Sequence, residues 1–298
     1  MEKILTLATD TDNIISSETI EVIEDYLQMK FELHWIEREI ACDLIPNKLI
    51  VHGEKDFIKK IEIICNRLKI DWSFQDIVNR KKKLLLCDMD STIIGQECID
   101  EIARYIGIEK YNEISEITEQ AMQGNITFNE ALEKRVRMLK DVREEELKEI
   151  YNSSIKLNKG ADTLISTMNK NGCFTVLISG GFTFFTSRIA SLISFNEHYS
   201  NELIFKEKKL TGELKPPILD SNEKYKKLIE ISKKMHIGPS HTMSIGDGSN
   251  DIKMIKHSNL GIAYKAKSIL KYYSNSQINH TNLTSALYFQ GFTKNEFS

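Results

Sequence analysis

Two aspartates that lie two positions apart are the first candidates for chemistry. Asp88 and Asp90 follow Leu84–Cys87, a short apolar run that ends abruptly in acidic residues. Such a run is typical of a fully buried parallel strand. Side chains alternate along an extended chain, so residues two apart point to the same side, and the two carboxylates are predicted to converge.

A hydroxyl followed by two glycines is the second candidate. Ser179, Gly180 and Gly181 follow the apolar run 174–178. Because glycine has no Cβ, an anion can approach the backbone N–H groups of such a turn closely. This segment is therefore predicted to hold phosphate oxygens.

The third candidate is the run GDGSND at 246–251, where a tight turn carries Asp247, Asn250 and Asp251. Lys224 lies on a helix-like stretch before it. In open α/β sheets, ligands bind at the carboxyl ends of the strands. We therefore expect the acidic cluster, the hydroxyl and the lysine to meet at one edge of a sheet.

Each of these signals is weak by itself. Two closely spaced acids often cap a helix or close a turn, and Ser-Gly-Gly often marks a loop. Lys224 shares its stretch with Lys226 and Lys227, which is typical of a solvated helix face. The functional interpretation is favoured because the motifs occur in order, each at the end of a predicted parallel strand.

Strand and helix signals alternate in the segment that carries these motifs. The predicted strands cover 84–87, 174–178, 203–205, 243–245 and 260–263. Helix-like stretches such as 224–233 separate them, which predicts a doubly wound parallel sheet of the α/β class.

A mostly helical segment, at about 97–151, lies between the first two predicted strands. Apolar residues recur at helical spacing from Cys98 to Ile106, and Gly107 is the predicted C-cap. A second helix is predicted from Phe128 to Leu139. We expect this insertion to form a helical cap over the strand ends.

Residues 1–80 are predicted to form a separate small α+β domain, because short apolar runs alternate with amphipathic stretches. These segments cover 4–7, 19–27, 33–40, 48–51 and 57–68. The basic run 80–83 is interpreted as a solvated linker, and the domain boundary is placed there.

The composition limits the class of protein. The 298 residues are 41% hydrophobic, which suits one large or two modest globular domains, and the net charge of -3 predicts no general attraction for nucleic acid or an anionic membrane. The cysteines are widely spaced and form no CxxC pair, as expected in a reducing compartment. With no apolar leader and no membrane-spanning stretch, a cytoplasmic protein is expected.

From Lys83 to the C-terminus, these motifs resemble the haloacid-dehalogenase superfamily and, within it, the phosphoserine phosphatases. The resemblance implies a core formed by 81–96 and 152–298, with the cap at 97–151. It also implies that Asp88 is the nucleophile and that Asp90 is the general acid and base. The phosphate-binding, charge-balancing and last acidic motifs of the family correspond to Ser179, Gly180, Lys224, Asp247, Asn250 and Asp251.

The same resemblance implies a substrate. Glu97, Met122, Phe128 and Arg135 fall at spacings similar to those of the phosphoserine enzymes. Glu97 would bind the ammonium of phosphoserine and Arg135 its carboxylate, while Met122 and Phe128 would close the pocket. Without the resemblance, a helix-terminal acid, a surface cation and ordinary core residues would be the preferred interpretation. The implied reaction is hydrolysis of phosphoserine, the last step of serine biosynthesis.

The implied cofactor is Mg²⁺, a hard cation that prefers oxygen ligands. Asp88 and Asp247 would supply carboxylate oxygens, and Asp90 would supply its backbone carbonyl. Asp251 would orient Lys224 or a metal-bound water, and Asn250 would support that network.

Two other functions remain open. A related phosphatase or phosphotransferase would act on phosphohomoserine, a nucleotide or a sugar phosphate. A signalling receiver domain also combines aspartates, a hydroxyl, a lysine and Mg²⁺ on a doubly wound sheet, but its acid pair lies apart from its phosphorylated aspartate. Here both acids adjoin one strand and a helical insertion follows, which favours the enzyme.

The two ends of the chain raise separate questions. Residues 1–80 resemble the ACT-like extensions of some phosphoserine phosphatases, which implies an amino-acid-binding module. The alternative is a docking or dimerisation domain without a ligand, through which a homodimer could form. It is favoured because no glycine precedes Gly53, so the glycine-bearing first turn that is common in ligand-binding ACT modules is missing. The run LYFQG at 287–291 resembles part of a protease site, but its continuation to Phe297 favours a native tail.

Overall fold

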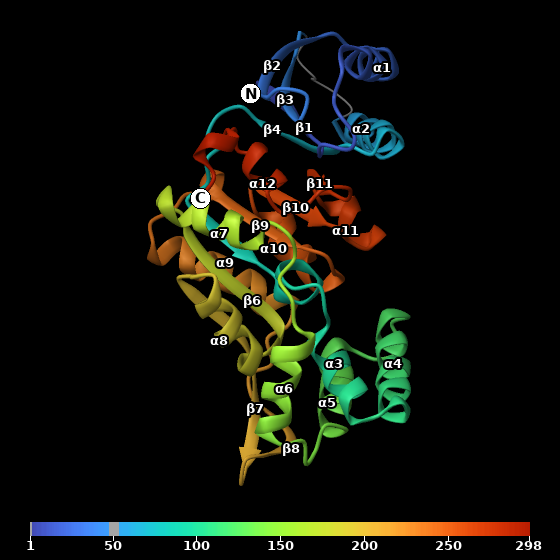
Figure 1. Ribbon diagram of the computed structural model, residues 1–298, viewed down its shortest axis with the longest axis vertical. Helices are drawn as coiled ribbons and strands as arrows, with labels where there is room; N and C mark the ends of the chain where they lie inside the picture. Colours follow the sequence, from blue (N-terminus) through green and yellow to red (C-terminus); the bar gives the residue numbers. More distant parts are fainter. Residues whose placement is uncertain (1, 48–53) are drawn as a thin grey trace.

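One continuous sheet runs through the computed structural model in Figure 1, which describes residues 2–47 and 54–298. The apolar run expected at 48–51 falls outside the described residues. In the described part of the chain, the strand order is β2-β3-β1-β4-β11-β10-β9-β5-β6-β7-β8. Two units that the sequence predicts to be separate domains therefore share one hydrogen-bonded sheet.

The N-terminal unit is an antiparallel sheet covered by two helices. Its elements are β1 (Lys3–Ala8), α1 (Ser17–Leu27), β2 (Phe31–Glu37), β3 (Ala41–Pro46), α2 (Glu54–Leu68) and β4 (Asp71–Asp76). Ser16 caps α1, because its Oγ accepts a hydrogen bond from the Thr19 N–H at 3.2 Å. The predicted α+β character is confirmed, and β4 is an additional strand.

The rest of the sheet is mostly parallel. Its strands are β5 (Leu84–Cys87), β6 (Phe174–Phe182), β7 (Glu197–Lys206), β8 (Lys209–Lys215), β9 (Thr242–Gly246), β10 (Leu260–Tyr264) and β11 (Ser276–Ile278). The parallel pairs are β11·β10, β10·β9, β9·β5, β5·β6 and β6·β7. This arrangement confirms the predicted α/β class.

The strand predicted at 203–205 requires a correction. These residues form the distal part of β7, where they pair with β8 in an antiparallel hairpin. The parallel pairing with β6 is made by the earlier part of β7, where Glu197 lies opposite Val176 and Tyr199 opposite Ile178. Because that part is polar, apolar patterning did not indicate it.

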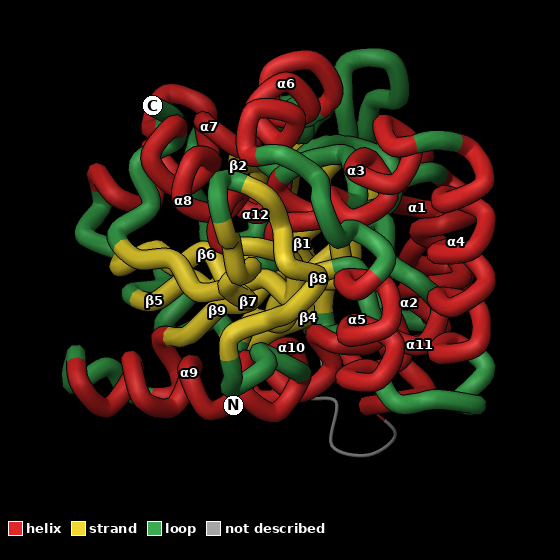
Figure 2. The backbone as a smooth tube through the Cα atoms, turned by 90° about the horizontal axis from the view of Figure 1, so that it is seen from below, coloured by secondary structure: helices red, strands yellow, loops and turns green. Residues whose placement is uncertain are grey.

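Helices cover both faces of the parallel sheet, as Figure 2 shows. They are α7 (Ala161–Lys170), α8 (Thr183–Leu192), α9 (Ser221–Lys234), α10 (Ile252–His257) and α11 (Ser268–Tyr273), whereas α12 (Ser285–Tyr288) contacts β1 of the N-terminal unit. Along β5, Leu85 and Cys87 pack in one core cluster while Leu84 and Leu86 pack in another. Burial on both faces explains why the strand is continuously apolar.

The segment between β5 and β6 is helical. It consists of α3 (Cys98–Ile106), α4 (Ile108–Met122), α5 (Phe128–Arg137) and α6 (Glu144–Ser154), which lie at the end of the molecule opposite the N-terminal unit (Figure 1). The first predicted helix and its C-cap at Gly107 are confirmed, as is the helix that begins at Phe128. The other two helices are mostly polar, so apolar periodicity did not reveal them.

The interpretation of the basic run 80–83 as a solvated linker is correct only in part, because Lys81 and Lys83 are exposed whereas Arg80 and Lys82 are held by the fold. Lys82 is only 4% exposed, and its ammonium donates to the Asn79 carbonyl and the Asn259 side chain, both at 2.6 Å. Arg80 binds the Asp43 carboxylate through both Nη atoms, at 2.7 and 2.9 Å. Both cations are fixed inside the joint between the two units.

Three further contacts fix that joint. β4 pairs antiparallel with β11, so that Ser73 lies opposite Ser276. The buried carboxylate of Asp71 accepts hydrogen bonds from the backbone N–H groups of residues 279–281, at 2.6 to 2.9 Å. The C-terminal segment adds the third contact, because the carbonyl of the buried residue Phe289 accepts a hydrogen bond from the Gln75 side chain at 2.6 Å.

Within the described ranges, 2–47 and 54–298, no helix combines the length and apolar character needed to cross a membrane.

Candidate active site

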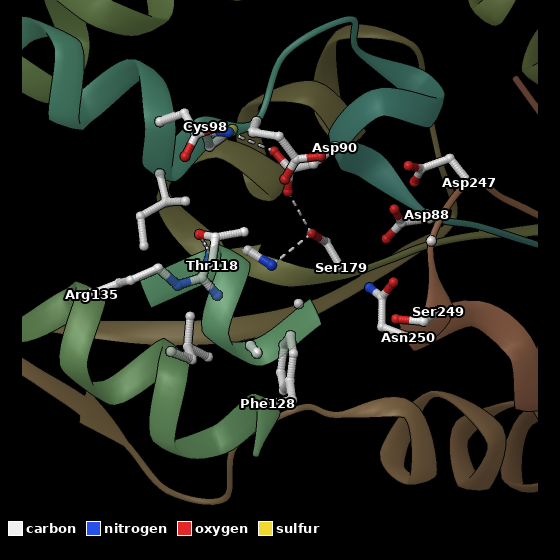
Figure 3. Close-up of a pocket in the computed structure, with 18 of the residues that line it drawn as sticks. Asp88, Asp90, Cys98, Thr118, Phe128, Arg135, Ser179, Asp247, Ser249 and Asn250 are labelled. Carbon is white, nitrogen blue, oxygen red and sulfur yellow. Dashed lines mark hydrogen bonds between the residues drawn. The ribbon is translucent and has the colours of Figure 1, made fainter. Parts of the chain in front are cut away.

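A cavity of about 580 Å³ lies at the carboxyl ends of β5, β6 and β9. Figure 3 shows that Asp88, Asp90, Ser179 and Asp247 approach it from the sheet side, while Arg135 lies across the cavity from them. The motifs expected to meet at one sheet edge are therefore brought together.

The irregular turn after β5 aims its two aspartates into this cavity. The strand ends at Cys87, and Met89–Ile93 form a short helical turn that is interrupted by Asp90 and by Ser91, whose φ is 56°. The backbone is therefore not a simple extended strand between the aspartates. Both carboxylates nevertheless line the same pocket.

Lys224 is a buried cation that joins two of the acids. It lies in the first turn of α9, which begins where the Asp220 carboxylate accepts the Asn222 and Glu223 N–H groups. Its Nζ donates to Asp88 Oδ1, and to Asp251 Oδ1 at 2.7 Å. Lys224 and Asp251 are fully buried, so the surface-face interpretation of this lysine does not hold.

The charges around Lys224 are unbalanced. Burial alone would lower the pKa of Lys224, but the Asp251 and Asp88 charges raise it above its usual range, so the ammonium stays charged. Burial and the Asp251 charge raise the pKa of Asp88, although Lys224 opposes this shift. One lysine therefore does not compensate the negative charge of Asp88, Asp247 and Asp251 together.

These three carboxylates fit a divalent cation. Asp88, Asp247 and Asp251 each offer one oxygen, and the three oxygens lie within 4.8 Å of one another. An all-oxygen donor set of this kind suits a hard metal ion, whose charge would offset the uncompensated acids. A metal-binding role for this part of the site is therefore consistent with the residues present.

Asp90 has a different environment from Asp88. Its Oδ1 accepts a hydrogen bond from the Cys98 N–H at 2.8 Å, and its Oδ2 accepts one from Ser179 Oγ at 3.0 Å. Burial raises the pKa of Asp90, while the hydrogen bonds from Cys98 and Ser179 oppose the shift. A carboxyl with a raised pKa can carry a proton to a leaving group.

The Ser179-Gly180-Gly181 turn lies directly beside Asp90. The Gly181 N–H donates to Ser179 Oγ at 2.8 Å. A Cβ at Gly181 would lie 2.6 Å from Asp90 Oδ2, so a larger residue does not fit there. Asn201, which sequence analysis did not identify, fixes the turn by donating to the Gly180 carbonyl at 2.8 Å.

The residues predicted to recognise the substrate come from the helical insertion. Glu97 precedes α3, and its Oε1 accepts a hydrogen bond from Ser91 Oγ at 2.7 Å. Desolvation by the pocket walls and the nearby Asp90 charge raise the pKa of Glu97. Its side chain lines the cavity and is nevertheless exposed. Phe128 lies against Gly180.

Arg135 and Asn250 also line the cavity, from α5 and from the turn after β9. Met122 ends α4, but its side chain lies outside the described part of the structure. Its predicted contact with the substrate therefore stays a prediction.

The sequence analysis missed several residues of the cavity wall, and three of them carry a side chain that could take part in recognition. They are Asp100, Thr118 and Lys267. Helical spacing could have indicated the first two, because Asp100 follows Glu97 by three positions and Thr118 precedes Met122 by four. Lys267 follows β10 on a loop, where spacing gives no comparable signal.

Comparisons with known proteins identify the relatives of this chain. A family profile described as haloacid dehalogenase-like hydrolase matches residues 85–256. A phosphoserine phosphatase from Archaeoglobus fulgidus is 40% identical over 247 residues, which cover 81% of this chain and 71% of that protein.

Solved structures share the fold. The crystal structure of a HAD family hydrolase from Salmonella enterica serovar Typhi has a TM-score of 0.85 at 24% identity, and the match covers 97% of this chain and 98% of the other. A substrate-bound phosphoserine phosphatase complex has a TM-score of 0.65 at 37% identity, covering 70% of this chain and 97% of the other. The chain therefore belongs to the haloacid dehalogenase-like hydrolase family.

Proposed function

We propose that this protein hydrolyses phosphoserine to serine and phosphate, as the last step of serine biosynthesis. The observation that carries the proposal is the layout of the cavity. Groups suited to phosphate chemistry come from the strand ends, and a carboxylate and a guanidinium, Glu97 and Arg135, come from the helical insertion. The relatives named phosphoserine phosphatase support the same substrate.

Asp88 is the proposed nucleophile. One of its carboxylate oxygens attacks phosphorus, and a new bond from this oxygen to phosphorus forms as the bond from phosphorus to the serine oxygen breaks. Asp90 gives its proton to the departing serine oxygen. In the second step, Asp90 takes a proton from water as the water attacks phosphorus, which releases phosphate and regenerates Asp88.

The remaining polar groups stabilise the phosphoryl oxygens. The Ser179 hydroxyl turns from Asp90 to the bound substrate and, with the Gly180 N–H and Lys224, donates toward the charge that these oxygens carry in the transition state. Asp251 orients Lys224 through their 2.7 Å hydrogen bond, and Asn250 supports this network and the substrate from the turn after β9.

We propose Mg²⁺ as the cofactor, bound by the carboxylates of Asp88 and Asp247 and by the backbone carbonyl of Asp90. When bound, it supplies positive charge that reduces repulsion between Asp88 and the phosphate dianion. The close approach of the Asp88 and Asp247 carboxylates supports a cation at this position, while Asp251, the third acid of the cluster, is held by Lys224.

Specificity for an amino acid is assigned to the insertion. Glu97 binds the substrate ammonium and Arg135 its carboxylate, which suits a bidentate guanidinium. Met122 and Phe128 close the pocket. In this proposal, residues 97–151 act as the cap and residues 81–96 and 152–298 as the catalytic core. Residues 1–80 form an ACT-like domain that serves as a docking or dimerisation unit.

Phosphate release from a panel of substrates tests this function. The panel contains phosphoserine, phosphothreonine, phosphohomoserine, a nucleotide and a sugar phosphate, each with Mg²⁺ or with a chelator. We expect the highest kcat/KM for phosphoserine and no turnover with chelator. Turnover of another ester without turnover of phosphoserine would contradict the substrate and retain the reaction type, whereas phosphorylation without steady phosphate release would favour a receiver.

A further inference from the structure

Arg135 is held in the cavity wall by two neutral acceptors. Its Nε donates to the Ala131 carbonyl one turn earlier on α5, and its Nη1 donates to Thr118 Oγ1 on α4, both at 3.3 Å. Thr118 and Arg135 lie together on the wall opposite Asp88 and Asp247 in Figure 3. The contact with Thr118 therefore joins two helices that are adjacent in the insertion.

The hydroxyl of Thr118 can serve Arg135 only as an acceptor. Its single proton is donated to the Ile114 carbonyl of α4, at 3.0 Å. The lone pairs of the oxygen then remain for the guanidinium. The Ile114 contact thus fixes the orientation of the Thr118 hydroxyl, so that its oxygen accepts the hydrogen bond from Arg135.

These contacts leave most of the guanidinium available. A guanidinium has five N–H groups, and the Ala131 and Thr118 contacts use two of them, so three remain on the Nη atoms. In the described part of the chain, no carboxylate forms an ion pair with Arg135, although Asp100 and Glu97 are near enough to influence its pKa. The charge is therefore held in place without being neutralised by direct contact.

We infer that Thr118 is a positioning residue, which orients the Arg135 guanidinium so that its free N–H groups face the carboxylate of the substrate. The inference rests on the proposed function and adds a residue for which no role is otherwise assigned. Thr118 does not contact the reacting atoms. Its effect is on recognition of the carboxylate, because a bidentate contact depends on the orientation of the guanidinium plane.

Two substrates separate this role from a general effect on folding. Phosphoserine carries the carboxylate, whereas phosphoethanolamine carries the phosphate and ammonium alone. In Thr118→Val, which keeps the shape and removes the acceptor, we expect KM for phosphoserine to rise about three- to tenfold, the range for one lost hydrogen bond. The kcat should change less than KM, and the preference for phosphoserine over phosphoethanolamine should fall by a similar factor.

Two variants serve as controls. Thr118→Ser retains the hydroxyl and should restore the preference. Ser153→Ala removes a hydroxyl that donates to the carbonyl four residues earlier on α6, at 2.8 Å, but lies outside the cavity wall, so it should leave the preference unchanged. Thr118→Ala repeats the test if thermal melting shows that Thr118→Val is unfolded at the assay temperature.

The outcomes distinguish failure of the proposed substrate from failure of the role inferred for Thr118. A wild-type enzyme that shows no preference for phosphoserine over phosphoethanolamine contradicts the proposed substrate, and the inference about Thr118 fails with it. A wild-type enzyme that has the preference, together with a Thr118→Val variant that keeps it, overturns the inference alone. An equal loss for both substrates also overturns it, because that result indicates a purely structural role.

Discussion

The hydroxyl of Ser179 donates a hydrogen bond to Asp90 Oδ2 across 3.0 Å, although the two residues lie 89 positions apart in the chain. Parallel pairing of β5 with β6 creates this contact, because it brings the ends of the two strands together. The contact links the residue proposed to bind phosphate to the residue proposed to move the proton. It also favours the charged form of Asp90, against the effect of burial.

Removing this hydroxyl should therefore change both binding and the pH profile. Ser179→Ala should lower kcat/KM about tenfold or more, because a hydrogen bond to a charged group contributes about 1.5–3 kcal/mol. It should also raise the pKa of Asp90 further, so that the acid stays protonated to higher pH. Because kcat/KM reports the free enzyme, in which this contact exists, we expect the basic limb of the kcat/KM profile to move to higher pH.

A pH titration of kcat/KM for Ser179→Ala and for Ser249→Ala checks this. Ser249 lines the same cavity, but none of its described contacts reaches Asp90, so its variant should keep the wild-type limb. A limb that moves to lower pH in Ser179→Ala would show that the hydrogen bond does not act on Asp90 as described.

Lys224 should be essential for stability as well as for activity. Lys224→Met leaves Asp88 and Asp251 buried without their cation, and loss of one partner from a buried ion pair costs about 3–5 kcal/mol. Urea denaturation in the presence of a chelator measures this loss, and an added divalent cation should offset part of it.

Lys226 offers a matched control on the same helix. Its ammonium pairs with Glu223 at 2.6 Å on the surface, with the Lys226 side chain 67% exposed, so Lys226→Met should cost no more than about 1 kcal/mol. Similar free energies of unfolding for the two variants would mean that the buried ion pair does not stabilise the fold.

The titration of Lys82 should make the free energy of unfolding increase with pH. Burial lowers the pKa of Lys82 to about 8, whereas an unfolded lysine titrates near pH 10.4. Between these values the unfolded chain binds more protons, so the free energy of unfolding rises with pH by roughly 3 kcal/mol at most. This component should be absent from Lys82→Met and retained in Lys81→Met, where the lost side chain is 52% exposed.

Urea denaturation of the three proteins at several values between pH 7.5 and pH 10.5 measures the component. The wild-type curve should rise relative to Lys82→Met across this window. Parallel curves would indicate that Lys82 keeps an ordinary pKa in the folded protein.

The sequence predicted the parallel core because its strands are short, apolar and followed by polar residues. It did not predict β4, in which apolar Trp72 and Phe74 alternate with polar Ser73 and Gln75. The polar side chains are buried but hydrogen-bonded, Gln75 to the Phe289 carbonyl and Ser73 to Ser276. Such partners lie more than 200 positions away, so no local pattern can indicate them.

The same limit applies to the site. The Asp88, Ser179 and Asp247 motifs could be found because each lies at the end of a strand, where topology determines the position. Thr118 could not be assigned a role, because its function depends on how α4 packs against α5. The basic run at Arg80 and Lys82 was misinterpreted for a similar reason: its acceptors come from Asp43 and Asn259, far away in the chain.

Trapping of the phosphorylated enzyme tests the central claim, that Asp88 is the nucleophile. After brief reaction with an activated aryl phosphate and acid quenching, peptide mass spectrometry should locate phosphate on Asp88 in the wild type. Asp90→Asn should still be labelled, because this leaving group needs no proton, and should release phosphate slowly. Asp88→Asn should show neither label nor turnover. Turnover near the wild-type rate in Asp88→Asn, or label on another residue, would contradict the account.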